Sequence, residues 1–453
     1  MISRKSVPLR SLALLIVSAL AVFACNDEGD TGQVGVTDGG PRVAPDRLIL
    51  PFVVSRQGAL QDQGREQARG ALVAAQQLNS LGGILGRQVE IEFLEDNSDP
   101  ATAAVLAGRL TELAAPIVLG PTGSPAAASL RQALPNQLFI SPSATSPVLD
   151  VDAAGGVPAA SMLFRTAPSD TLLAKAIALL ASFGDPADTS KPACDSLSIV
   201  NSDDDYGRPI ADRVEQLFKA TAKVVTKRTP VPGTLQSPAV YEAVAQGILG
   251  VEKSCQLVIA PSEIAADYMR AFRRSQAQVG GDWSAFQTFG ANALRTEAFL
   301  RASRQDPAVE TSPSLAVGIK AVAAESEPEG TNFSAYRSMY QAQFPTDPIG
   351  RSANAYDAVI VTALALEAAG SGADQNKLRL SLENVSKFGT AYGPGKVGDA
   401  LVELRRGIDI DYVGASGLLD FDNKGSVLAD FLVWRVAEGK FVYSSRFVRS
   451  ELQ

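Results

Sequence analysis

The fold is constrained most strongly by residues 116–147 (PIVLGPTGSPAAASLRQALPNQLFISPSATSP), where two short apolar runs flank a helical pattern. Strands are expected at 117–119 and 138–140, with a helix at 126–134 between them. This alternation is typical of βαβ units, whose two strands are parallel. The pattern therefore predicts an α/β fold built on a parallel sheet.

A loop of small residues follows each of these strands, at 120–125 and at 141–147. Open parallel sheets bind ligands beyond the carboxyl ends of their strands, where both loops are expected. The loops offer backbone N–H groups and the hydroxyl groups of Ser124 in the first loop and of Ser141, Ser143 and Thr145 in the second. We predict a cradle for a small anionic group such as a carboxylate. The alternative is that these residues serve only as turn residues.

The composition excludes several classes of function. The chain has no histidine, so Ser–His and Cys–His nucleophile pairs, imidazole bases and His-ligated metals are absent. An enzyme would need a lysine, cysteine or carboxylate-pair mechanism, and no such constellation occurs near the two loops. The formal net charge of −8 argues against nucleic acid as a partner. We therefore expect a protein that is no enzyme and needs no cofactor or metal.

The N-terminus has the pattern of an export signal. Three basic residues among the first ten precede an apolar run at 12–24, which is too short to span a bilayer. We therefore assign 1–24 to a secretory signal peptide. Residues 21–25 (AVFAC) resemble a bacterial lipobox, which implies cleavage before Cys25 and lipid attachment to it; a plain signal peptide cut nearby is the alternative. Residues 25–45 then form the lipidated cysteine and a flexible, Gly- and Asp-rich tether.

Five motifs follow one another along the rest of the chain. They are LNSLGGILGRQVEIEFLEDNSDPATA (78–103), VLGPTGSPAAASL (118–130), ISPSATSP (140–147), FRTAPSD (164–170) and DDDYGRPIAD (203–212). In this order they resemble type I periplasmic binding proteins of the leucine/isoleucine/valine-binding family, over residues 46–448. The resemblance implies an α/β fold of two doubly wound parallel-sheet lobes joined by three crossing strands.

The resemblance also implies a domain organisation and a function. The N-terminal lobe would comprise 46–166 plus 323–420, and the C-terminal lobe 167–322 plus 421–453. The implied protein is a lipoprotein facing the periplasm or the cell exterior, held at the membrane by its lipid alone. It would capture a small amino-acid-like solute between its lobes and deliver it to an ABC permease. The alternative is a lipoprotein of the same fold that acts as a ligand sensor or a partner-binding scaffold.

Both lobes contribute ligand contacts according to the resemblance. In relatives that bind amino acids, the solute carboxylate is held by positions that correspond here to Ser124, Ser143, Ala144 and Thr145. A tyrosine at the position of Tyr206 also contacts the solute.

The partner of the solute's ammonium group departs from the family pattern. The family has an acidic residue where this chain has Asn292, and an aromatic position of the second lobe falls near Glu263. Glu263 then supplies the negative charge instead, or the solute lacks an ammonium group. Glu263 as a solvated loop residue is a further alternative.

Cys194 and Cys255 each precede a predicted strand of the second lobe, at 197–201 and 256–260. In a doubly wound sheet of order 2-1-3 these strands are neighbours, so both cysteines lie at the same end of adjacent parallel strands. An exported chain keeps such a bond oxidised. We predict a disulfide, with two buried free thiols as the alternative.

Overall fold

The computed structural model describes residues 47–452 apart from 151–160, 189, 253, 325–329, 371–373 and 423. The predicted signal peptide, Cys25 and the tether lie outside the described residues. Among the helices of the described part, none has the length and apolar character needed to cross a bilayer.

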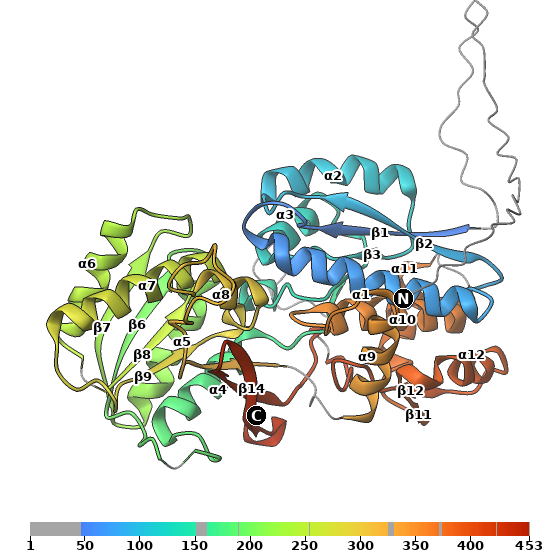
Figure 1. The fold of residues 1–453 in the computed structure, drawn as a ribbon. Coiled ribbons are helices and arrows are strands. Elements are labelled where there is room, and N and C mark those ends of the chain that lie inside the picture. Colours follow the sequence, from blue (N-terminus) through green and yellow to red (C-terminus); the bar gives the residue numbers. More distant parts are fainter. Residues whose placement is uncertain are drawn as a thin grey trace, which may run out of the picture. The chain divides into compact units, whose positions relative to one another are not determined.

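The first sheet is parallel and has five strands in the order β2-β1-β3-β4-β5 (Figure 1). Its strands are β1 (Arg47–Val54), β2 (Gln88–Glu95), β3 (Val118–Leu119), β4 (Phe139–Ser141) and β5 (Leu163–Arg165). Helices α1 (Gln61–Ser80), α2 (Pro100–Leu113) and α3 (Ser124–Ala133) connect the first four strands. The βαβ alternation expected around residues 116–147 is confirmed.

The second sheet has seven strands in the order β14-β13-β10-β9-β8-β6-β7. They are β6 (Ser196–Ser202), β7 (Val224–Val231), β8 (Cys255–Ile259), β9 (Gln287–Gly290), β10 (Lys320–Ala323), β13 (Phe431–Ala437) and β14 (Lys440–Phe447). The neighbouring strands β10, β9, β8, β6 and β7 are all parallel to one another. Strand β13 is antiparallel to both of its neighbours, β10 and β14. The antiparallel edge arises because only Glu438 and Gly439 join β13 to β14, and a two-residue turn links antiparallel strands.

Two groups of helices accompany the sheets. Helices α4 (Asp170–Phe183), α5 (Gly207–Ala220), α6 (Pro238–Leu249), α7 (Ser262–Val279) and α8 (Glu297–Ala302) pack on the second sheet. The later helices return to the first sheet: α9 (Thr331–Gln343), α10 (Ser352–Ala369), α11 (Gln375–Asn384) and α12 (Val397–Arg405), with the short ladder β11 (Thr390–Tyr392) and β12 (Ile410–Tyr412). Helix α10 lies beside α1 despite their distance in the sequence (Figure 1).

We call the first sheet with α1–α3 and α9–α12 the N-lobe, and the second sheet with α4–α8 the C-lobe. Along the described chain three connections join them, from β5 to α4, from β10 to α9 and from β12 to β13. The first and third connections run side by side, because the Arg165 N–H donates to the Gly425 carbonyl at 2.8 Å. Arg351, directly before α10, donates from Nη1 to the Ala324 carbonyl of the second connection at 3.0 Å. The predicted fold class is confirmed.

Cys194 and Cys255 form a disulfide bond, as predicted. The order β7-β6-β8 places the first and third strands of the C-lobe side by side, with Leu197 opposite Cys255 in parallel register. Both cysteines are fully buried. The bond therefore ties two central strands of the second sheet together at one end.

Candidate functional site

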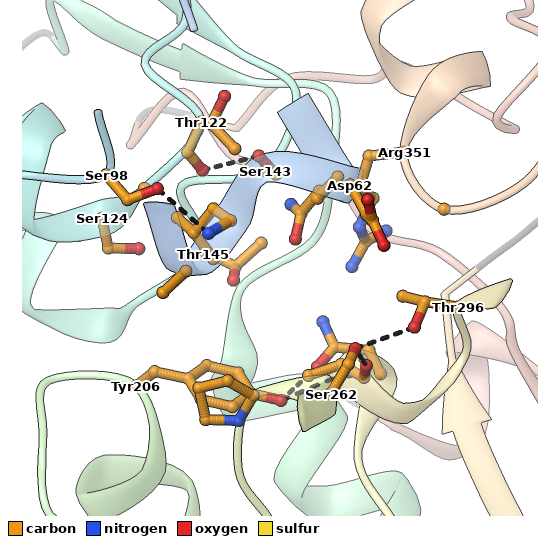
Figure 2. Close-up of a pocket in the computed structure, with 18 of the residues that line it drawn as sticks. Asp62, Ser98, Thr122, Ser124, Ser143, Thr145, Tyr206, Ser262, Thr296 and Arg351 are labelled. Atoms are coloured by element: carbon orange, nitrogen blue, oxygen red, sulfur yellow. Dashed lines mark hydrogen bonds between the residues drawn. The ribbon is translucent and has the colours of Figure 1, made fainter. Parts of the chain in front are cut away.

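A cavity of about 240 Å³ lies between the two lobes. Its lining comes from loops that follow strands in both sheets, which is where ligands bind in open α/β sheets. Figure 2 shows Ser124 and Thr145 of the N-lobe across the cavity from Tyr206 and Ser262 of the C-lobe. A solute in this cavity contacts both lobes at once.

The lobes also touch each other beside the cavity. The Ser146 hydroxyl donates to the Asp205 carbonyl at 3.3 Å. The Arg301 guanidinium donates to the Asp62 carboxylate at 3.3 Å.

Six of the described helices begin at the cavity lining: α1, α3, α5, α7, α8 and α10. A helix N-terminus carries a partial positive charge and unpaired N–H groups. Four of these helices have an acidic residue in or directly before the first turn, namely Asp62, Asp204, Glu263 and Glu297. The two without one are α3 and α10, both of the N-lobe. The helix N-termini of the cavity lining that lack an acidic residue therefore both belong to the N-lobe.

Helix α3 offers an anion its N-terminus directly. Its N-cap is Gly123, which supplies no side-chain cap, and its first residue is Ser124. The Ser124 Oγ accepts a hydrogen bond from the Ser146 N–H at 3.2 Å, which leaves its own proton to donate. An uncapped helix N-terminus with a hydroxyl beside it is suited to a carboxylate.

The second loop of the predicted cradle differs from expectation because its backbone N–H groups bond within the loop. The Ser141 Oγ accepts from the N–H groups of Ser143 at 3.2 Å and Ala144 at 2.9 Å, and donates to the Pro121 carbonyl at 2.6 Å. Ala144 is fully buried and does not line the cavity. Its N–H group is not available to a solute.

Ser143 reaches the cavity, but its hydroxyl is also engaged. It accepts from Gln67 Nε2 at 2.7 Å and donates to the Thr122 carbonyl at 2.7 Å. Gln67 in turn accepts from the Thr122 hydroxyl at 2.8 Å. Ser143 and Ala144 thus fix the shape of the loop, and Thr145 is the other member of this loop that lines the cavity.

A buried carboxyl group lies behind Thr145. The Asp170 side chain is hydrogen-bonded to that of Thr145, and the Asp170 N–H donates to the Thr145 carbonyl at 2.9 Å. Burial raises the pKa of Asp170 to about 6, opposed by the Thr145 hydrogen bond and by the charges of Arg351 and Arg165. Arg351 also lines the cavity. Asp170 therefore fixes the position of Thr145 through two hydrogen bonds, and the charges of Arg351 and Arg165 stabilise the Asp170 carboxylate.

Tyr206 and Asn292 form one unit on the C-lobe side. The Tyr206 hydroxyl donates to Asn292 Oδ1 at 2.8 Å and accepts from the Ala293 N–H at 3.3 Å. Burial raises the pKa of Tyr206, so its hydroxyl stays protonated at neutral pH. Because the Asn292 oxygen already accepts a hydrogen bond, its amide nitrogen is the group that can donate to a solute.

Glu263 lines the same cavity from the first turn of α7 rather than from a loop. Its side chain is half-buried. Burial raises the pKa of this carboxyl, and the neighbouring charges of Asp62 and Asp267 raise it further. Asp204, another acidic residue of the cavity lining, already has a hydrogen-bond partner. Its carboxylate accepts from the Gly207 N–H at 2.7 Å.

The family model for periplasmic binding proteins matches residues 50–401. The chain belongs to the periplasmic binding protein family. This match covers most of the chain and confirms the resemblance to type I proteins of the leucine/isoleucine/valine-binding family.

Curated relatives of this periplasmic binding protein match over a shorter range. The Leu/Ile/Val-binding protein BraC3 of Rhizobium johnstonii is 27% identical over 178 residues, which cover 38% of this chain and 43% of the relative. The chemotactic signal transduction system substrate-binding protein BasB of Halobacterium salinarum is 29% identical over 167 residues, with 36% and 38% covered. The matched segments thus span less than half of the length of either relative.

Solved structures show the same fold over nearly the whole length. The branched-chain amino acid transporter substrate-binding protein LivJ of Streptococcus pneumoniae, solved with isoleucine, has a TM-score of 0.68 at 19% identity, covering 89% of this chain and 99% of its own. A solute-binding protein of an ABC transporter from R. palustris, solved with benzoate, has a TM-score of 0.67 at 15% identity, covering 88% and 96%.

The structure brings most of the predicted site residues of this periplasmic binding protein together. Those that line the cavity are Ser124, Ser143, Thr145, Tyr206, Glu263 and Asn292. Ala144 lies behind the lining. Sequence reasoning missed Arg351 and Arg295, which also line it. Neither belongs to a motif; the one available signal was the position of Arg351 directly before a long apolar helix.

Proposed function

We propose that the protein is an extracytoplasmic solute-binding lipoprotein that captures a small amino-acid-like carboxylate between its lobes and delivers it to an ABC permease. The observation that carries this proposal is the cavity between the lobes, with the uncapped N-terminus of α3 and the Ser124 hydroxyl on one side. Membership of the periplasmic binding protein family supports it. Lipidation at Cys25 would keep the solute-loaded form at the membrane surface.

Four residues of the predicted site have a part in this proposal. Ser124 and the N-terminus of α3 bind the solute carboxylate, while Thr145 contacts the solute from the N-lobe and Tyr206 and Asn292 contact it from the C-lobe. The lobe boundaries at 166/167, 322/323 and 420/421 fall in or next to the three connections, where we expect the chain to bend when the lobes close. Closure would be favoured because only the closed form offers contacts from both lobes.

The test is calorimetric titration and thermal unfolding of the protein purified from membranes in a mild detergent. The solutes are amino acids, aliphatic carboxylates and benzoates. We expect a saturable increase in melting temperature, since a solute at a hundred times its Kd adds about 2.7 kcal/mol to the free energy of unfolding.

The decisive variants are Ser124→Ala and Thr145→Val. Ser124→Ala removes the hydroxyl that can donate to the solute carboxylate, and Thr145→Val removes the hydroxyl that holds Thr145 against Asp170. We expect affinity to fall at least tenfold in Ser124→Ala, since hydrogen bonds to charged groups contribute about 1.5–3 kcal/mol, and to fall in Thr145→Val because the loop loses this support. Ser129→Ala is the matched control, because Ser129 lies on α3 but outside the cavity lining. Equal affinity in all four proteins, or no solute bound by the wild type, would refute the proposal.

A second candidate function is solute sensing, favoured by the match to BasB, which belongs to a chemotactic signal transduction system. A sensor also binds a solute, but its loaded form binds a receptor instead of a permease. Crosslinking of the solute-loaded protein in membranes separates the two, because a transport protein captures permease subunits.

A further inference from the structure

An ion pair joins the two lobes beside the cavity. Asp62 lies in the first turn of α1 in the N-lobe, and Arg301 lies in the last turn of α8 in the C-lobe. The Arg301 guanidinium donates to the Asp62 carboxylate at 3.3 Å. This contact exists only while the lobes are together, so it bears on how readily they close.

Acidic helix ends of opposite lobes face each other at this place. Helix α1 has Asp62 in its first turn, and α7 of the C-lobe has Glu263 in its first turn. Figure 2 shows Asp62 across the cavity from Ser262 and Thr296, which stand at the starts of α7 and α8. Each acid suits the positive end of its own helix, but closure brings two negative charges toward each other.

The charges of Asp62 and Arg301 both act on Glu263. Burial raises the pKa of the half-buried Glu263 carboxyl, the charge of Asp62 raises it further, and the charge of Arg301 lowers it. Two carboxylates that approach each other in a partly buried site repel. Arg301 therefore pairs with one of the two acids and offsets the charge of the other.

Separation of the lobes would change these interactions unequally. Glu263 and Arg301 both belong to the C-lobe and move together, whereas Asp62 moves with the N-lobe. In an open form Asp62 keeps Arg65, its neighbour on α1 at 3.8 Å, but loses Arg301. Closure thus gains an ion pair and brings Asp62 near Glu263, and it is favoured at this place only because Arg301 is positive.

Arg301 acts on closure without touching the solute. It is not among the described residues that line the cavity, and its side chain is 54% exposed. Exposed ion pairs are weak, so this one changes the ratio of closed to open molecules by about twofold to fivefold. A bias of this size favours the closed form but leaves the final population to the solute.

We infer that Arg301 is a positioning residue for lobe closure: it bridges the acidic helix ends of the two lobes and raises the closed population before a solute binds. This inference rests on the proposed function, because it takes closure as the step that captures the solute. It adds a residue outside the solute site and makes closure sensitive to salt.

The experiment measures the distance between two spin labels by pulsed electron paramagnetic resonance, in the purified full chain without added solute. The labels are placed with Val105→Cys on α2 and Leu235→Cys before α6, because these side chains are 80% and 61% exposed and lie on different lobes. Cys194 and Cys255 are joined in a disulfide and do not take a label. Chains with one label site each correct for any signal from Cys25.

The wild type should show a shorter, closed distance whose share falls as salt is raised from about 20 mM to 500 mM, since salt screens exposed charges. Arg301→Gln should lower the ratio of closed to open molecules by about twofold to fivefold and weaken the response to salt. Arg301→Glu should lower this ratio further, because a third carboxylate then meets the other two. Arg301→Lys keeps the charge and should retain most of the closed form.

A charge swap tests whether the pairing itself is the cause. Adding Asp62→Lys to Arg301→Glu again places opposite charges on the two lobes, so it should restore the closed form. Arg274 and Glu242 are the matched control, because they form a pair at 3.0 Å with side chains 48% and 41% exposed, and both belong to the C-lobe. Arg274→Glu should leave the label distances unchanged.

The outcomes separate the inference from the proposed function. Equal distance distributions in the wild type, Arg301→Gln and Arg301→Glu would overturn the inference, and so would a charge swap that leaves Arg301→Glu open. Neither result affects the proposed function, which is tested by solute titration. If the distances depend on Arg301 but no solute binds, the proposed function fails while the bridging of the lobes by Arg301 is upheld.

Discussion

Asp357 in α10 shows how single residues hold the connections between the lobes. Its carboxylate accepts from the Tyr412 hydroxyl at 2.8 Å, from the N–H groups of Ala415 at 2.8 Å and Ser416 at 2.7 Å, and from the Ser416 hydroxyl at 2.6 Å. Tyr412 is the last residue of β12, and Ala415 and Ser416 belong to the start of the third connection. Burial raises the pKa of Asp357 to about 6 and outweighs the hydrogen bonds, which lower it.

The raised pKa gives a prediction about stability and pH. The folded protein binds the Asp357 proton more tightly than the unfolded chain does, so the contribution of this carboxyl to the free energy of unfolding is greatest below its ordinary value of 3.8 and is lost as the pH rises through 6. The free energy of unfolding of the wild type, relative to that of Asp357→Asn, should therefore fall by about 3 kcal/mol between pH 3.5 and pH 7. Urea unfolding of both proteins at several pH values measures it; parallel curves would contradict the prediction.

At the same scale the sequence identified most of the candidate site but not how its groups are used. Ser124, Tyr206, Glu263 and Asn292 meet in one cavity. The sequence could not show that Ser141 takes the N–H group of Ala144, because a short side-chain bond within a loop depends on the exact backbone path.

At the scale of elements, the strongest patterns were placed well and helix α7 was missed. The strands expected at 117–119 and 138–140 and the helix expected at 126–134 overlap β3, β4 and α3. One alternative for Glu263 was a solvated loop residue, whereas it lies in helix α7, whose buried residues Ile264, Tyr268 and Met269 have helical spacing. The short elements β11 and β12 carry too few residues for a periodic signal.

The disulfide gives a prediction at this scale. It closes a loop with a sequence separation of 61 residues, so removing it in a Cys194→Ala, Cys255→Ala double variant should lower the free energy of unfolding by about 3–4 kcal/mol. Guanidinium unfolding with and without reductant measures it. The wild type should lose the same amount when reduced, whereas the double variant should not respond. A double variant as stable as the oxidised wild type would contradict the prediction.

At the scale of the whole molecule, Arg165 connects the cavity to two of the connections between lobes. It lies at the end of β5 with its side chain 1% exposed. The guanidinium bonds to Asp150, to the Ser426 hydroxyl of the third connection and to the Ser146 carbonyl beside the cavity. One buried cation thus ties together segments that are distant in the sequence.

Arg165→Met should therefore destabilise the protein strongly. Removing one member of a buried ion pair leaves the other without its partner, and we expect a loss of about 3 kcal/mol in the free energy of unfolding. Arg208→Met is the control, because Arg208 and Asp203 form an exposed pair with both side chains 51% accessible, and its loss should be below about 1 kcal/mol. Thermal unfolding of both variants measures it, and equal melting temperatures would refute the assigned role of Arg165.

The sequence by itself determined the α/β class, the βαβ order and the cysteine pair, because these follow from local periodicity and from the general rule for strand order in doubly wound sheets. The division into two lobes was implied by the resemblance of five motifs to a known family. The tertiary structure decided which hydroxyls face the cavity, which acids already have partners, and that Arg351 and Arg165 lie where the connections meet. Those facts depend on contacts between residues far apart in the chain. The free energy of burying a charge is set by the groups around it in space, and the local pattern of a sequence does not contain them.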